Sequence, residues 1–107
     1  MSRTIRLLYR NLQGRVRANF NWGIEPPITK RSVVVMSAAE AKVDPGGILG
    51  LENATTFHLG DADVYVTNVS PHEGGVEFII HVNWGAPLDV LVDLTVLGDR
   101  EDFFGVD

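Results

Sequence analysis

Apolar and polar residues alternate one by one along most of this 107-residue chain. Successive side chains of a β-strand point to opposite faces of a sheet, so this spacing is typical of strands with one buried face. The stretch 88–97 is the clearest case, because its even-numbered positions are all apolar, whereas Asp89, Asp93 and Thr95 share the opposite phase. The alternation predicts an all-β protein.

Residues that favour turns divide the chain into seven expected strands. We expect these strands at 4–10, 15–22, 32–36, 55–59, 62–69, 76–84 and 88–97. The first two are expected to pair as a hairpin, and so are the fourth and the fifth. Short strands with frequent turns and little helix favour a sandwich or a barrel over alternating α/β units.

We therefore predict a single-domain antiparallel β-sandwich of about seven strands over residues 1–107, with an immunoglobulin-like or fibronectin-like architecture. A small β-barrel is the alternative, because alternation does not reveal whether a sheet closes on itself. A chain of this length is expected to build one hydrophobic core. Residues 99–107 are expected to form an acidic tail that carries aromatic residues.

Two short segments call for separate predictions. The β-branched run Val33–Val35 predicts a strand that is buried on both faces or crosses the core. The stretch Ser37–Glu40 has the spacing of a capping box, which favours one helical turn, with an edge strand containing a bulge as the alternative.

The amino-acid composition of the chain excludes several classes of function. The chain has no cysteine, which excludes disulfides, thiolate metal sites and thiol redox chemistry. The N-terminal residues lack the apolar run of a secretory signal, and no apolar stretch is long enough to cross a bilayer, so we expect a cytoplasmic protein without membrane contact. No catalytic or cofactor-binding motif is visible, and we expect neither an enzyme nor a cofactor.

Three histidines, His58, His72 and His81, are the weak candidates for metal ligands. No pair of them shows a recognised ligand spacing such as His-Glu-x-x-His, so no metal is predicted. A small histidine-based metal protein is the least favoured functional alternative.

Both tryptophans occur in the same tripeptide, Asn21-Trp22-Gly23 and Asn83-Trp84-Gly85, at the end of an expected strand. Each shares the inward phase of its strand, so the favoured interpretation is that both indole rings are buried at an end of the sandwich. The alternative is a carbohydrate- or small-ligand-binding platform in which Trp22 and Trp84 stack on the ligand and Asn21 and Asn83 supply polar contacts.

Charge is distributed unevenly along the sequence. Residues 1–31 hold seven of the nine basic residues but only one acid. In the expected hairpin, Arg6, Arg10, Arg15 and Arg17 would form a basic ridge that binds a partner. The alternative is that these arginines form surface ion pairs with acids such as Glu77, Asp89 and Asp93. A net charge of −5 argues against a nucleic-acid partner.

The tail from Asp99 to Asp107 contains adjacent phenylalanines, Phe103 and Phe104, among acidic residues. They are expected either to dock into a partner or to fold back over an open end of the sheets. Together with the absence of catalytic motifs, these features predict a non-enzymatic protein-interaction or self-assembly domain, with a protein partner or a homo-oligomer as its complex.

Overall fold

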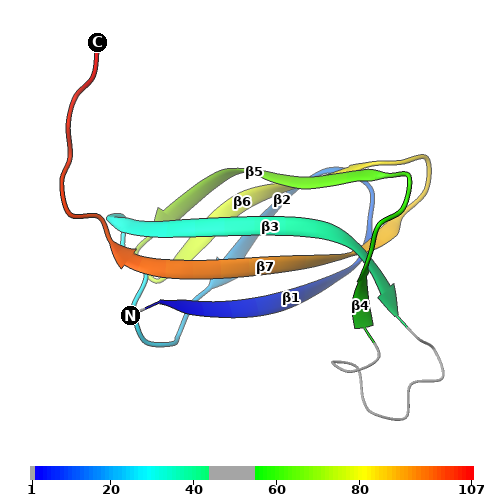
Figure 1. Cartoon of the computed structure of the whole chain (residues 1–107), viewed down its shortest axis with the longest axis horizontal. Coiled ribbons are helices and arrows are strands. Elements are labelled where there is room, and N and C mark those ends of the chain that lie inside the picture. Colours follow the sequence, from blue (N-terminus) through cyan, green and yellow to red (C-terminus); the bar gives the residue numbers. More distant parts are fainter. Residues whose placement is uncertain (1, 44–54) are drawn as a thin grey trace.

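The computed structural model describes residues 2–43 and 55–107, and every regular element within them is a β-strand (Figure 1). In chain order the strands are β1 (Arg3–Leu12), β2 (Gly14–Asn21), β3 (Ser32–Val43), β4 (Thr55–His58), β5 (Asp63–His72), β6 (Gly75–Asn83) and β7 (Leu88–Asp99). The prediction of an all-β fold is confirmed for this part of the chain.

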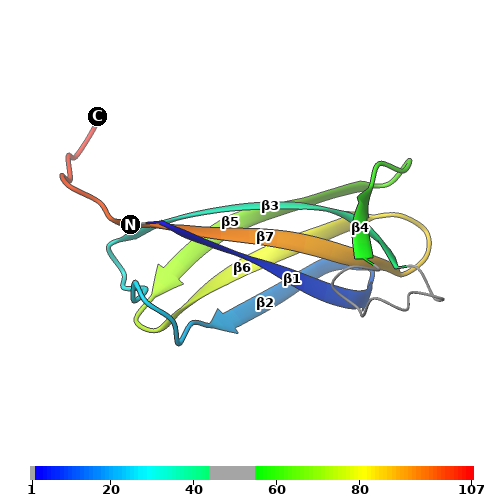
Figure 2. The ribbon, with the colours of Figure 1, turned by 60° about the horizontal axis from the view of Figure 1, so that its bottom comes forward.

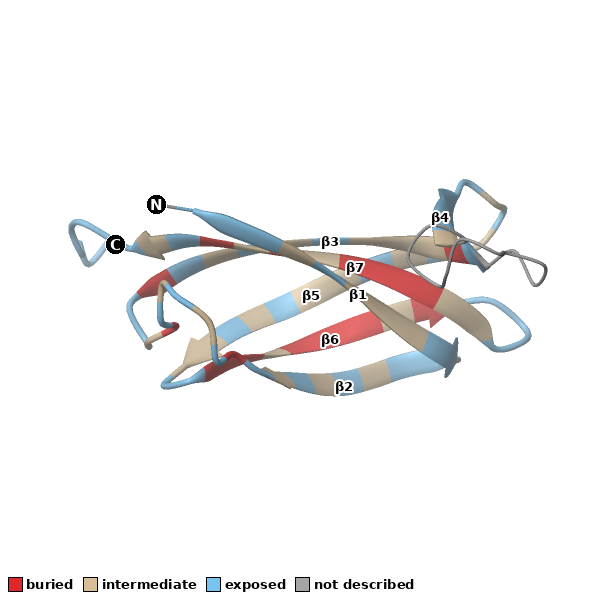
Figure 3. Cartoon of the chain, turned by 90° about the horizontal axis from the view of Figure 1, so that it is seen from below, coloured by how far each residue is buried: buried red, intermediate tan, exposed pale blue. Residues whose placement is uncertain are grey.

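The strands form two antiparallel sheets, with strand orders β1-β7-β3-β4 and β2-β6-β5. The sheets lie on opposite sides of the core (Figure 3). Along one side of the molecule β3 of one sheet runs beside β5 of the other, and this contact joins the two sheets (Figures 1 and 2). The arrangement is sandwich-like. The immunoglobulin-like connectivity is not confirmed, because the first two strands of that fold are neighbours, whereas β1 pairs with β7 here.

The predicted hairpin between the first two strands is wrong. β1 pairs with β7 and β2 pairs with β6, so the chain passes from one sheet to the other at Gln13. Asn11 and Gly14 flank this point with φ angles of 62° and 75°, a left-handed backbone that redirects the chain. Strands that switch sheets do so through such bends. Alternation indicates which face of a strand is buried but not which strand is its partner.

The second predicted hairpin is also wrong. β4 pairs with the last residues of β3, whereas β5 pairs with β6 in the other sheet. Residues 59–62 therefore connect the two sheets instead of forming a tight turn within one.

The observed strand β3 differs from the predictions for residues 33–40. Ser37–Glu40 belongs to the continuous strand and forms no helical turn. Within it, Ser37–Ala39 pair with β7 alone and Glu40 pairs with both β7 and β4, while the register shift of the β3–β7 pair falls earlier, between Val33 and Val34. Val34 packs against the core, but Val33 and Val35 point to the outer face and are exposed, so this run is buried on one face only.

The core lies between the two central strands, β6 and β7. Its fully buried side chains include Phe78, Ile80 and Val82 from β6 and Val92 and Leu94 from β7. These are the positions that the alternation assigns to the inner face. Edge strands contribute partly buried residues.

Tyr9 of edge strand β1 packs edge to face on Phe78, with ring centroids 6.2 Å apart. Burial raises the pKa of the Tyr9 hydroxyl above its ordinary value.

Residues 22–31 close one end of the sandwich. The backbone amide of Trp22 donates to the carbonyl of Gly74, and the amide of Gly74 donates to the carbonyl of Ile28. The indole Nε1 of Trp22 donates to the carbonyl of Pro26 at 2.8 Å. Trp22 is only 5% exposed, and Ile28 is buried beside it in the same core cluster. The prediction that Trp22 is buried at an end of the sandwich is confirmed.

The side chain of Asp99 ties the end of β7 to this closing segment. Its carboxylate accepts hydrogen bonds from the hydroxyls of Thr29 and Ser32 and lies 3.7 Å from the guanidinium of Arg31. The amide of Arg100 donates to the carbonyl of Arg31. The chain beyond β7 therefore leaves the molecule on the side of β3.

Candidate interaction surface

The four arginines of the expected basic ridge do not form one surface. Arg6 and Arg10 lie on β1, and Arg15 and Arg17 lie on β2, so they belong to different sheets. The ridge required the hairpin that the structure lacks, and its prediction is wrong.

The alternative of surface ion pairs is confirmed for two arginines. Arg6 binds the carboxylate of Asp93 through two hydrogen bonds of 2.7 and 3.0 Å. Arg17 binds Glu77 at 2.8 Å. The hydrogen bonds from Arg6 to Asp93 raise the pKa of the guanidinium, partly offset by desolvation. Each partner pair lies on adjacent strands, and exposed pairs of this kind contribute about 0–1 kcal/mol.

The third acid considered for these ion pairs, Asp89, accepts a hydrogen bond from the backbone amide of Asn11 instead. It therefore holds the end of β1 against β7.

The four-stranded sheet curls around its outer face. β1 and β4 are the two edge strands of this sheet, yet side chains from them meet. The guanidinium carbon of Arg6 on β1 lies 4.3 Å from the centroid of the Phe57 ring on β4. β4 crosses over the sheet at this point (Figures 1 and 2). The curl leaves a groove between β1, β7 and β4.

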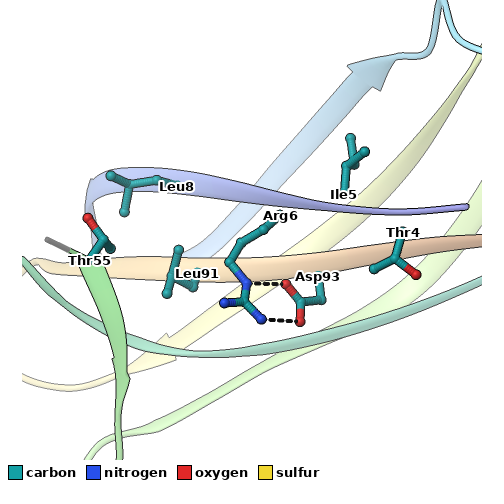
Figure 4. A pocket seen from close by; sticks show the side chains of 7 residues that line it. All are labelled: Thr4, Ile5, Arg6, Leu8, Thr55, Leu91 and Asp93. Carbon is teal, nitrogen blue, oxygen red and sulfur yellow. Dashed lines mark hydrogen bonds and ion pairs between the residues drawn. The ribbon is translucent and has the colours of Figure 1, made fainter. Parts of the chain in front are cut away.

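This groove encloses about 760 Å³, which falls in the size range of ligand clefts. Figure 4 shows its lining side chains: Thr4, Ile5, Arg6, Leu8, Thr55, Leu91 and Asp93. Leu8 and Leu91 are register partners and form an apolar floor, and the Arg6–Asp93 pair lies beside them. The groove thus offers apolar contact, mainly from Leu8 because Leu91 is only 3% exposed, next to the Arg6–Asp93 ion pair.

The tail beyond Asp99 extends away from both sheets (Figures 1 and 2). Phe103 and Phe104 are 78% and 80% exposed, and Val106 is exposed as well. The expectation that a phenylalanine folds back over an open end of the sheets is wrong, because the segment 22–31 already closes that end. The Phe103 ring has a contact with Arg100 of its own tail, whose guanidinium carbon lies 5.3 Å from the ring centroid.

The four residues of the expected ligand platform are separated. Trp22 is bonded to Gly74 just before β6, and Trp84 directly follows the end of β6. Nine strand residues lie between these points, which at about 3.3 Å per residue separates the backbone of the two tryptophans by roughly 30 Å along β6. Asn21 lies opposite Gly75 at the first end of β6, and Asn83 lies opposite Asp63 at the other end.

The prediction of a buried indole is wrong for Trp84, which is 46% exposed. Trp22 has residues 23–31 folded over it, whereas the chain turns directly into β7 after Trp84. Trp84 is the tryptophan that a ligand can reach.

The histidines occupy three separate places. His58 lies opposite Glu40 on the β3–β4 pair. Nε2 of His72 bonds the Asn19 side-chain oxygen at 2.7 Å, and Nε2 of His81 bonds the hydroxyl of Thr67 at 2.7 Å. Over residues 2–43 and 55–107, no three His, Asp or Glu side chains gather in a way that would hold a metal ion.

One aromatic arrangement was not visible in the sequence. Tyr65 and His81 are register partners on the outer face of the three-stranded sheet, and their rings stack with centroids 4.5 Å apart. Tyr65 is exposed. The sequence shows only that each residue has the outward phase, and the stack requires the pairing of β5 with β6.

The groove was also missed, although the sequence contains a signal for it. Leu8 and Leu91 are apolar residues at outward-facing positions, between arginines in β1 and between aspartates in β7. Each breaks the polar pattern of its strand's outer face. Whether the two leucines lie side by side depends on the register of β1 against β7, which alternation does not determine.

Within the described residues, no helix has the length and hydropathy needed to cross a membrane. Comparison with family models, curated proteins and solved structures found no match to this chain. The described residues form an all-β fold with two antiparallel sheets.

Proposed function

We propose that this protein is a non-enzymatic interaction domain that self-associates through its C-terminal tail, residues 99–107. The exposure of the adjacent rings of Phe103 and Phe104 carries this proposal. Large apolar side chains grouped on a surface are typical of contact sites, since their burial in a complex is favourable.

A further apolar surface lies where the tail leaves the sheet. Val33 and Val35 on β3 and Leu97 on β7 are exposed large apolar residues. Val33 lies opposite Gly98 and Val35 lies opposite Thr95, so all three gather at the end of the four-stranded sheet. Tail and sheet end together supply the apolar area that an interface needs.

Ion pairing makes Asp93 and Glu77 weak candidates for acid–base catalysis. Arg6 and Asp93 engage each other, and so do Arg17 and Glu77. An acid–base catalyst needs a group that is free to exchange a proton with a substrate. Carboxylates held in ion pairs are poorly suited to that task.

Molar mass measured by light scattering after size exclusion, at several protein concentrations, tests the proposal. We expect the mass of the full chain to rise with concentration, and the double variant Phe103→Ser/Phe104→Ser to stay monomeric. Tyr65→Ser is the matched control, because it removes an exposed aromatic ring from the three-stranded sheet and leaves the tail unchanged. A monomer at every concentration contradicts the proposal.

The serine variant is preferable to a shortened chain. Removal of residues 99–107 would also delete the Asp99 carboxylate, which binds Thr29 and Ser32, and the Arg100 amide, which binds Arg31. Any loss of association would then be mixed with damage to the closing segment.

A second candidate function is the binding of a planar or carbohydrate ligand on the three-stranded sheet. Tyr65 is stacked on His81 on the outer face of this sheet, Asn83 shares the phase of His81, and the exposed Trp84 lies just beyond the end of the strand. Exposed aromatic faces beside polar groups suit ligands that stack and accept hydrogen bonds.

Tryptophan fluorescence tests this second candidate. We expect a soluble quencher such as acrylamide to reduce the emission of Trp84 in the Trp22→Phe variant, and to affect Trp22 much less in the Trp84→Phe variant, because only Trp84 is exposed. A sugar or nucleoside that binds here would protect Trp84 from the quencher. If no member of a ligand panel protects it, this second function is rejected.

A further inference from the structure

We infer that the Phe103–Phe104 tail of one copy binds in the groove between β1, β7 and β4 of a second copy. The inference rests on the proposed self-association and names the acceptor surface for it. The groove is lined by Thr4, Arg6, Leu8, Leu91 and Asp93 together with Ile5 and Thr55.

Apolar contact supplies the first match. The two phenylalanine rings are the most exposed aromatic groups among the described residues. The groove has an apolar floor in which the half-buried Leu8 is the accessible side chain and Leu91, 3% exposed, lies beneath, and it has about 760 Å³ of space. An aromatic side chain that fills a pocket is the common anchor of a protein interface.

Charge supplies the second match. Beyond Asp99, whose carboxylate is held by the segment before β3, residues 100–107 contain three acids, Glu101, Asp102 and Asp107, against the single base Arg100. The strand β1, which forms one wall of the groove, carries Arg6 and Arg10 on its outer face and no acid. Asp93 in the groove lining offsets the charge of Arg6, whereas Arg10 has no ion pair with a described residue. Arg10 therefore attracts an acidic peptide to this wall.

The path of the tail favours a second copy over the tail's own groove. The Arg100 amide is bonded to the Arg31 carbonyl, just before β3, so the tail leaves on the side of β7 that is opposite to β1. The tail points away from the sheets in this structure (Figure 1). To enter its own groove, the chain would have to reverse and cross β7, whereas a second copy can present its groove directly.

A complementation experiment tests the inference. Phe103→Ser/Phe104→Ser has an intact groove and a disabled tail. Leu8→Glu has an intact tail and places a carboxylate on the groove floor. Leu8 is not part of the core cluster, so the substitution is expected to leave the fold intact. We expect each variant alone to be monomeric and an equal mixture to recover a complex of two chains.

Two further variants keep the result interpretable. Thr4→Glu adds a carboxylate at an exposed position of the groove wall, so it tests the groove even if Leu8→Glu fails to fold. Leu59→Glu is the matched control, because Leu59 is fully exposed and does not line this groove. We expect Thr4→Glu to weaken self-association about tenfold or more, because its carboxylate repels the acidic tail, and Leu59→Glu to leave it unchanged.

The outcomes separate the two proposals. If Leu8→Glu and Thr4→Glu still associate while the serine variant does not, the tail binds elsewhere and the groove assignment is overturned, whereas self-association stands. If the full chain is monomeric at every concentration, self-association itself fails. A tail that enters its own groove would give that same monomeric mass and would overturn the second-copy inference. Added salt is expected to weaken the recovered complex, since it screens the attraction between arginines and carboxylates.

Discussion

Replacing Trp22 with alanine is expected to lower the free energy of unfolding by about 3–5 kcal/mol, the usual cost of deleting a buried aromatic side chain. Trp22 packs edge to face on Phe20, with ring centroids 6.4 Å apart, and its Nε1 holds the carbonyl of Pro26. The substitution therefore leaves a cavity and an unpaired carbonyl at the closed end of the sandwich. Urea denaturation measures the change.

Trp84→Ala is the matched comparison, since the same tripeptide surrounds both tryptophans. Trp84 is 46% exposed, so its removal is expected to cost less than about 1 kcal/mol. Equal losses for the two variants would show that burial of Trp22 does not stabilise this end of the molecule.

Phe78→Ala is expected to have an effect of similar size, about 3–5 kcal/mol. Phe78 lies on the central strand β6, is almost completely buried, and contacts the ring of Tyr9 from the opposite sheet. Its loss would open a cavity between the two sheets at the point where β1 is held to the core. The same denaturation experiment gives the magnitude.

Phe104→Ala serves as the control for the second prediction, because Phe104 is 80% exposed in the tail. We expect its unfolding free energy to stay within about 0.5 kcal/mol of the parent protein. A large destabilisation by Phe104→Ala would mean that the tail stabilises the folded monomer, which contradicts its assignment as an intermolecular contact.

Leu8 and Leu91 illustrate how a candidate site was present in the sequence without being recognisable there. Each leucine interrupts a row of polar outward-facing residues. Single apolar residues on a surface are common and carry little information. They become one apolar floor only because the β1–β7 register sets them opposite each other and because β4 curls over the same face.

The exposed tail was anticipated as one of two alternatives. Two adjacent phenylalanines among acids, after the last alternating segment, indicated a tail that either docks into a partner or folds back over an open end of the sheets. The structure adds where the tail leaves, because the Asp99 carboxylate and the Arg100 amide bind the segment before β3. That direction is the reason for assigning its groove to a second copy.

The inner faces of β2, β6 and β7 follow from the amino-acid order alone. A pleated strand turns alternate side chains to opposite sides whichever strand it pairs with, so a period of two is enough to assign Phe78 and Leu94 to the core. The all-β class follows from the same local geometry.

Strand partners were decided only by the tertiary structure. β1 lies next to β2 in the chain but pairs with β7, about 80 residues away, because the left-handed backbone at Asn11 and Gly14 sends β2 into the other sheet. The different burial of Trp22 and Trp84 has the same kind of origin, since identical tripeptides are followed by different connections. Alternation is a property of one strand, whereas pairing and end closure depend on contacts between segments far apart in the sequence.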